Sequence, residues 1–236
     1  MLVKTYASAI QGISARTVTV EVDISAGINF FMVGLPDSAV KESQRRIESA
    51  LRSAGFEITK KRVVINLAPA DLRKEGSAYD LPLAIGILAA SGVVPPGMLQ
   101  DYVIMGELSL DGSLVPIRGS LSMAIHAREE GFRGIILPFT NGRKAGVVEG
   151  LKVYGMKDLG QVVRFLSGEE GDSAGEGGSG LRPFNPSEFS GMEEFSGRED
   201  SLICPDFAEV KGQSRVRRAL EVAAAGGRNL LMLYTV

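Results

Sequence analysis

A strongly acidic segment interrupts the 236-residue chain and limits how much of it can fold as one domain. Residues 168–209 carry 11 Asp and Glu residues against two Lys and Arg residues, and they include the Gly- and Ser-rich run 171–180. A segment of this composition has too little apolar surface to offset the conformational entropy lost on ordering. We therefore predict a folded domain over 1–167, a disordered linker over 168–204 and a short piece of a second domain over 205–236.

The composition outside this segment excludes several classes of protein. No apolar run approaches the roughly 20 residues needed to cross a bilayer, and the first residues do not resemble a signal peptide. The single cysteine, Cys204, excludes an intrachain disulfide and a thiolate metal cage, and the single histidine, His126, argues against a histidine metal centre. We expect a cytoplasmic protein with no metal site and no membrane partner.

Periodicity predicts strands in the N-terminal domain. Residues 18–24 alternate Val and Ile with polar residues, which is typical of a half-buried strand. Asp111-Gly112 predicts a tight turn between strands over 102–110 and 113–116. Apolar runs predict further strands over 28–33, 62–67 and 134–137.

Capping residues predict the helices between these strands. Asp37 is placed to cap a helix that ends near Ala54, and Asp80 to cap an apolar helix that ends near Ser91. A further helix is expected over 120–130, and short elements over 143–148, 152–154 and 158–166. Strands mixed with helices, together with a hairpin, predict an α/β (α+β) fold whose sheet is not purely parallel.

Five segments of the domain carry a family resemblance. They are Val33–Asp37, Asn66–Asp71, Lys74–Ala84, Gly106–Gly112 and Pro116–Gly119. Together they resemble the N-terminal ChlI-type domain of the YifB/ComM family, the bacterial magnesium-chelatase-like AAA+ ATPases. The resemblance implies a ribosomal protein S5 domain 2-like, Lon-protease-domain-like fold for 1–167.

The C-terminal residues resemble the opening of the AAA+ module of the same family, over Asp206–Gln213, Arg217–Gly227 and Asn229–Met232. By this resemblance, Val210, Lys211 and Gly212 match part of an adenine pocket. Full-length relatives are expected to use ATP and Mg²⁺, to form hexamers and to drive DNA branch migration.

The phosphate-binding part of that module does not occur in the sequence. The family strand leads into a GxxxxGK[ST] loop, whose backbone N–H groups and Lys bind the phosphates of ATP. Residues 1–236 contain neither this Walker A loop nor a later acidic Walker B strand. We therefore expect a truncated chain that binds no cofactor and hydrolyses no ATP by itself.

The Lon-like resemblance also raises the question of peptidase activity. Lon-type proteases use a Ser in a G-x-S-A segment and a Lys on a later helix as nucleophile and base. Matching Gly76 to that glycine places Ala78 at the nucleophile position and Ser77 one residue early, while Leu121 falls at the position of the Lys. Both members of the dyad are therefore missing, although Ser77 near Lys74 is a conceivable substitute.

Basic residues concentrate in segment 41–75, which has nine Lys and Arg residues against five Asp and Glu residues. This pattern has two interpretations. It is a solvated helix and loop surface, or it contacts nucleic-acid phosphates without sequence specificity. The candidate contact residues are Arg45, Arg46, Arg52, Lys60, Lys61 and Arg62.

Taken together, the sequence predicts the N-terminal part of a ComM/YifB-type ATPase that acts as a non-hydrolysing module for binding substrate or for assembly. Its expected partners are DNA, a separate AAA+ ATPase chain or further copies of itself. Two alternatives remain open at this point: a residual Lon-like serine peptidase, and a truncated gene product without function.

Overall fold

A computed structural model describes residues 1–56, 61–169, 183–184 and 214–225. The chain divides into two compact units, Met1–Gly191 and Met192–Val236. In the second unit, the described residues form one amphipathic helix, α6 (Ser214–Ala225). The first unit contains all the features discussed below.

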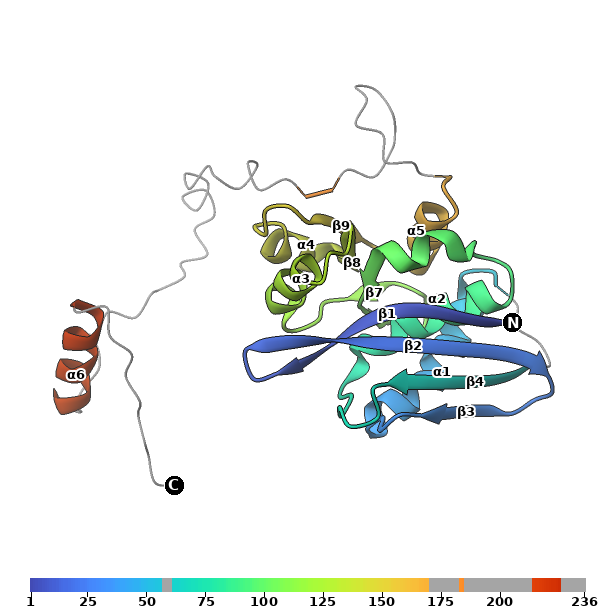
Figure 1. The fold of residues 1–236 in the computed structure, drawn as a ribbon, viewed down its shortest axis with the longest axis horizontal. Helices are drawn as coiled ribbons and strands as arrows, with labels where there is room; N and C mark the ends of the chain where they lie inside the picture. Colours follow the sequence, from blue (N-terminus) through green and yellow to red (C-terminus); the bar gives the residue numbers. More distant parts are fainter. Residues whose placement is uncertain (57–60, 170–182, 185–213, 226–236) are drawn as a thin grey trace. The chain divides into compact units, whose positions relative to one another are not determined.

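A mixed sheet of seven strands forms the first unit, in the order β3-β4-β2-β1-β5-β8-β9 (Figure 1). The pairs β1–β2 and β2–β4 are antiparallel, and the other four pairs are parallel. The strands are β1 (Leu2–Gln11), β2 (Ser14–Ala26), β3 (Phe30–Val33), β4 (Lys61–Ala68), β5 (Tyr102–Ile104), β8 (Gly134–Pro138) and β9 (Lys152–Met156). The predicted α/β class with a sheet that is not purely parallel is confirmed.

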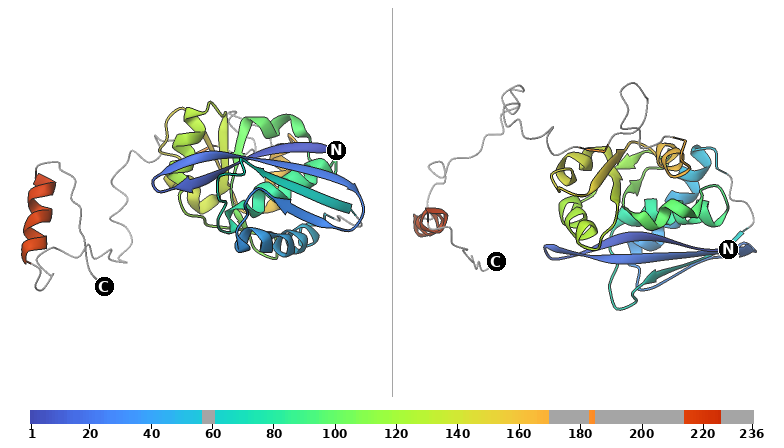
Figure 2. Two further views of the ribbon diagram at one scale, coloured as in Figure 1. Left: turned by 60° about the horizontal axis from the view of Figure 1, so that its bottom comes forward. Right: turned by 45° about the horizontal axis from the view of Figure 1, so that its top comes forward.

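Helices α1 (Ser38–Ser53) and α2 (Asp80–Ala90) cover one face of the antiparallel half of the sheet (Figure 2). All eleven residues of α2 are buried, as a helix that is apolar on every side requires. The other helical segments are η1 (Ser77–Tyr79), η2 (Pro96–Asp101), α3 (Ser120–Glu129), α4 (Phe139–Ala145) and α5 (Leu159–Leu166). None of the described helices is long and apolar enough to span a membrane.

Several predicted elements are confirmed. The alternating strand lies within β2, where its Val and Ile residues point into the core. Helix α1 begins after Asp37, whose Oδ1 accepts a hydrogen bond from the backbone N–H of Val40 at 2.7 Å. The predicted hairpin around Asp111-Gly112 is formed by β6 (Glu107–Leu108) and β7 (Leu114–Val115), which pair antiparallel. The single strand predicted over 102–110 is divided into β5 and β6, which belong to different sheets.

From the sequence, one strand was missed and one helix cap was assigned wrongly. Strand β1, the longest neighbour of β2, was not predicted at all. Asp80 does not cap α2, because the N-cap position is occupied by Tyr79 and the Asp80 carboxylate instead contacts Arg46. A carboxylate buried in the first turn of an apolar helix is stabilised more by a cation than by one backbone N–H group.

Most of the predicted linker over 168–204 lies outside the described residues, but Phe184 is described. Its N–H group donates to the carbonyl oxygen of Val153 on β9 at 2.8 Å, and its ring packs against Phe139 at 5.6 Å between centroids. A Cβ on Gly142 or Gly155 would overlap the Phe184 ring. Phe184 therefore covers the β9 edge of the sheet and belongs to the first unit.

Gly34 provides the first testable prediction. It follows β3 with a φ of +98°, and a Cβ there would overlap the backbone of Leu67 on β4. We expect Gly34→Ala to lower the free energy of unfolding by about 2 kcal/mol or more, because strain and backbone overlap add. Urea denaturation followed by circular dichroism measures the change. Gly97→Ala is the matched control, since no atom lies near its Cβ position, and a similar loss in both variants would contradict the prediction.

Candidate functional site

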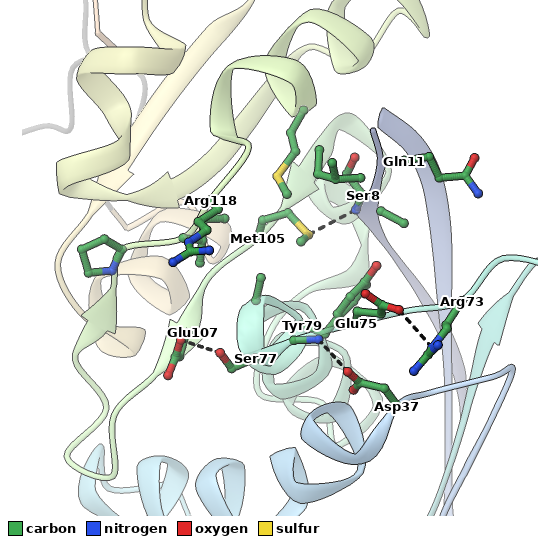
Figure 3. A pocket seen from close by; sticks show the side chains of 17 residues that line it. Ser8, Gln11, Asp37, Arg73, Glu75, Ser77, Tyr79, Met105, Glu107 and Arg118 are labelled. Carbon is green, nitrogen blue, oxygen red and sulfur yellow. Dashed lines mark hydrogen bonds and ion pairs between the residues drawn. The ribbon is translucent and has the colours of Figure 1, made fainter. Parts of the chain in front are cut away.

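A cleft of about 800 Å³ opens where β1 and β5 separate (Figure 3). Strand β1 pairs with β2 along its whole length, whereas its register with β5 is the single pair Tyr6↔Val103. The cleft therefore lies beside the last residues of β1 and beyond the carboxyl end of β5, a region where ligands commonly bind in open α/β sheets. Its walls are residues 8–11 of β1, the segment 73–79 and residues from the stretch 105–123, together with Asp37.

The segment 73–79 is held against the start of α1 by Asp37. Besides capping the helix, the Asp37 carboxylate accepts a hydrogen bond from the N–H group of Gly76 at 3.1 Å. The backbone of Lys74 bonds to Leu35 and to Asp37. These contacts fix one wall of the cleft to a helix terminus.

Lys74 is fully buried behind this wall. Its ammonium group donates to the carbonyl oxygens of Gly34, at 2.9 Å, and of Pro69. Burial lowers the pKa of Lys74 below its usual value, and the charge of Asp71 opposes that shift. Lys74 thus joins two loops and does not face the cleft as a base.

Ser77 has a different partner. Its hydroxyl donates to the Glu107 carboxylate at 2.5 Å. The structure therefore does not bring Ser77 and Lys74 together as a nucleophile and base. Ala78 lies half-buried in η1, and Leu121 is 43% exposed on α3, so the residues at the two Lon-type positions cannot supply the dyad chemistry.

Two hydroxyl groups in the walls of the cleft lack a hydrogen-bond partner in the described part of the chain. They belong to Ser8 and Tyr79, whose oxygen atoms are buried. Burial, and secondly the charges of Asp37 and Glu75, raise the pKa of Tyr79 well above its usual value. The phenol therefore stays neutral and keeps a proton to donate.

The other titratable candidates do not form a site. His126 is half-buried on α3, with Nε2 at 3.1 Å from Thr17 Oγ1, as expected for an ordinary packed histidine. Among the described residues, no group of three or more His, Cys, Asp or Glu side chains could hold a metal ion. Val210, Lys211, Gly212 and Cys204 lie outside the described residues.

The predicted basic residues divide into two groups. Arg45 and Arg52 are exposed on α1, seven positions apart, which places them on the same side of the helix. Lys61 and Arg62 are exposed at the start of β4. Lys60 lies outside the described residues.

Three of these cations gather beside the β3 edge of the sheet. Arg52 and Lys61 line one hollow of about 350 Å³, whose walls include Phe30 and Phe56. The guanidinium carbon of Arg62 lies 5.4 Å from the centroid of the Phe31 ring, which is 44% exposed. Because neighbours in a strand point to opposite faces, Arg52 and Lys61 lie on the α1 side of this edge, and Arg62 and Phe31 lie on the other side. We call these four residues at the β3 edge the basic-aromatic surface.

Arg46 does not belong to this surface, which corrects its prediction as a nucleic-acid contact. Its guanidinium donates to both carboxylate oxygens of Asp80, at 2.7 and 2.9 Å, and also to Ala39 and Ser43. Asp80 is fully buried. The hydrogen bond to Asp80 raises the pKa of Arg46, so the guanidinium is committed to an internal ion pair.

Comparison with known proteins gives two family matches. Residues 20–141 match the family described as subunit ChlI of Mg-chelatase, and residues 206–235 match the family described as magnesium chelatase, subunit ChlI. The first match covers the basic-aromatic surface and every wall of the cleft except residues 8–11 of β1. Of the second match, the structure describes only α6.

Individual relatives agree with these matches. The chain is 39% identical to competence protein ComM of Haemophilus influenzae, over 97% of this chain and 42% of the relative. It is 38% identical to the uncharacterized protein YifB of Escherichia coli, over 94% of this chain and 40% of the relative. DNA repair protein RadA of H. influenzae is 29% identical over 61% of this chain and 32% of RadA. The chain thus spans about two fifths of the length of ComM and YifB.

The Arg46–Asp80 pair predicts a large effect on stability. Arg46→Met removes the cation and leaves a fully buried carboxylate without its partner, so we expect a loss of about 3 kcal/mol in the free energy of unfolding. Arg45→Met on the neighbouring, exposed position is expected to change it by less than about 0.5 kcal/mol. Urea denaturation at neutral pH compares the two variants. Equal losses in the free energy of unfolding would show that the Arg46–Asp80 ion pair is not needed for stability.

Lys74 predicts a pH dependence. Because its pKa is lower in the folded than in the unfolded protein, the unfolded state binds more protons as the pH rises toward 10.5. The free energy of unfolding of the wild type is therefore expected to rise relative to that of Lys74→Met over this alkaline range. Urea denaturation of both proteins between pH 8 and 10.5 measures the difference. Parallel pH profiles of the free energy of unfolding in the two proteins would contradict the lowered pKa of the buried Lys74 amine.

Proposed function

Because this chain belongs to the magnesium-chelatase ChlI family, in the group that includes ComM and YifB, we propose that it is the DNA-engaging N-terminal part of a ComM-type AAA+ ATPase. In this proposal residues 1–167 are a cytoplasmic, S5 domain 2-like and Lon-protease-domain-like ChlI domain. Residues 168–204 are a linker, and 205–236 are the start of the ATPase domain, whose full-length relatives use ATP and Mg²⁺.

The observation that carries the proposal is the basic-aromatic surface. Arg52 and Lys61 line one hollow on the α1 side of the β3 edge, and the Arg62 guanidinium lies 5.4 Å from the centroid of the Phe31 ring on the other side. Glu48 lines the same hollow, but none of the three cations forms an ion pair in the described part of the chain, so their charges are available to a ligand. Exposed cations beside an exposed aromatic ring are the arrangement that binds single-stranded nucleic acid, with phosphates held by charge and a base stacked on the ring.

The names of two relatives support a nucleic-acid substrate, since one is a competence protein and another a DNA repair protein.

In this proposal the domain binds DNA without hydrolysing it, and it does not act as a peptidase. The cleft offers a neutral Tyr79, a Ser77 bonded to Glu107 and a Lys74 turned into the interior, and none of these is poised to attack a peptide bond. The domain would hold DNA while an ATPase module moves it, either in a separate chain or in a ring of identical subunits.

Charge reversal tests this function. We expect the full chain to bind a 30-nucleotide oligothymidine and a forked duplex at low salt, with affinity falling steeply as salt rises. Arg52→Glu combined with Lys61→Glu is expected to weaken binding by about tenfold or more, because two phosphate contacts become repulsive. Fluorescence anisotropy measures the affinities.

The matched control is Arg128→Glu combined with Lys144→Glu, which reverses two exposed cations on α3 and α4. This variant is expected to bind within about twofold of the wild type, because its charges lie outside the proposed surface. Phe31→Ala is expected to weaken oligothymidine binding about tenfold and duplex binding far less, since only an unpaired base can stack. Equal losses in both double variants, or no binding at low salt, would refute the proposal.

A further inference from the structure

The DNA proposal leaves the β1–β5 cleft without a role, although much of the family resemblance surrounds it. Asp37, segment 75–79, Glu107 and segment 116–118 all line the cleft and all lie within segments that carry the resemblance. Residues 8–11 of β1 complete the walls.

The cleft is also physically separate from the basic-aromatic surface. Asp37 precedes the first residue of α1, whereas Arg52 is in its last turn, and the 16-residue helix between them is about 24 Å long.

One wall of the cleft is an open strand edge. Beyond Tyr6, β1 has no strand partner on the β5 side within the described residues. The N–H group of Ser8 points to this side and donates to the sulfur of Met105 at 3.1 Å. A thioether is a weak acceptor on a flexible side chain, so this N–H group is readily transferred to a better partner.

The next backbone groups of β1 also face the cleft. Backbone groups two residues apart share the same edge of a strand, so the N–H and C=O groups of Ile10 lie on the cleft side as well. An unpaired edge of this kind is a template for an added strand. The buried and unpartnered hydroxyls of Ser8 and Tyr79 lie in the same walls.

The opposite wall is held rigidly in place. Asn141, buried on α4, accepts a hydrogen bond from the N–H of Ile117 at 2.9 Å and donates to its carbonyl oxygen at 2.7 Å. Gly119 packs directly on Ile10, because a Cβ there would lie 2.8 Å from Ile10 Cγ1. The segment 116–119 therefore stands at a fixed position facing the end of β1 before any ligand binds.

The charges in the cleft select the ligand. Arg73 pairs with Glu75 at 3.0 Å, Ser77 bonds to Glu107, and Asp37 accepts backbone hydrogen bonds. Arg118 is exposed and has no carboxylate partner in the described part of the chain. Three carboxylates disfavour a phosphate backbone, whereas one unpaired guanidinium suits a single carboxylate ligand.

We propose that the cleft binds an extended segment of another protein, which adds a strand to the β1 edge and places an acidic side chain against Arg118. Main-chain hydrogen bonds from residues 8–10 supply affinity, as in other cases of strand addition, and Arg118 supplies the preference for an acidic residue. The site lies outside the basic-aromatic surface, so peptide binding does not depend on the proposed DNA function.

Synthetic decapeptides test the proposal with the full chain. The probes alternate Val and Thr and carry a central Glu in one peptide and a central Lys in the other. We expect saturable binding of the Glu peptide by fluorescence anisotropy, and at least about tenfold weaker binding of the Lys peptide. Arg118→Glu, at an exposed position, is expected to reverse this preference, while Arg128→Glu on α3 leaves it unchanged.

A second variant tests the strand edge itself. Ile10→Pro removes an N–H group that faces the cleft and takes no part in the pairing with β2, and it is expected to weaken both peptides about tenfold or more. The Arg52→Glu and Lys61→Glu double variant is expected to bind them normally, which separates this proposal from the DNA function. Four outcomes would overturn the peptide proposal. Two concern affinity: the Glu peptide fails to saturate up to about 1 mM, or all variants bind it equally. The other two are displacement of the peptide by oligothymidine and self-association of the chain through the cleft.

Discussion

The fold depends on one buried charge and the cation that neutralises it. Helix α2 is enclosed on all sides, and Asp80 in its first turn is carried into the interior with it. Arg46 reaches Asp80 from α1 with both arms of the guanidinium, and the N–H group of Leu108 on β6 adds a third contact. One carboxylate therefore joins α1, α2 and the β6–β7 hairpin. A break in this junction would release the helix that supports both β1 and β2.

Both candidate sites follow from this arrangement. Because Arg46 fixes α1 against α2, the beginning of α1 stands at the cleft and its last turn stands beside the β3 edge. Asp37 at one end orders the 73–79 wall through Gly76, and Arg52 at the other end lines the same hollow as Lys61. The two ligands that we propose, a phosphate backbone and a peptide with an acidic side chain, would thus meet opposite ends of a single helix.

Local signals in the sequence predicted the parts of the fold that have one buried face. The alternation in β2 and the Asp37 cap of α1 were found because half-buried strands and helix starts have clear patterns. Strand β1 was missed because Ala7, Ser8 and Ala9 are all buried, so the strand shows no alternation at its most enclosed point. Asp80 was predicted only as a helix cap, and nothing local identifies Arg46 as its partner or distinguishes Arg46 from its exposed neighbour Arg45. The cleft was not predictable either, since its walls come from segments that lie far apart in the chain.

The central claim is that DNA contacts the β3 edge and not the cleft. Backbone amide NMR of the isotopically labelled chain, titrated with oligothymidine, maps the contact directly. The account predicts saturable shifts at Phe31, Arg52, Lys61 and Arg62, with the amides of Ser8, Ser77 and Arg118 unchanged. Shifts concentrated at the cleft residues, or spread evenly over all exposed cations, would contradict it.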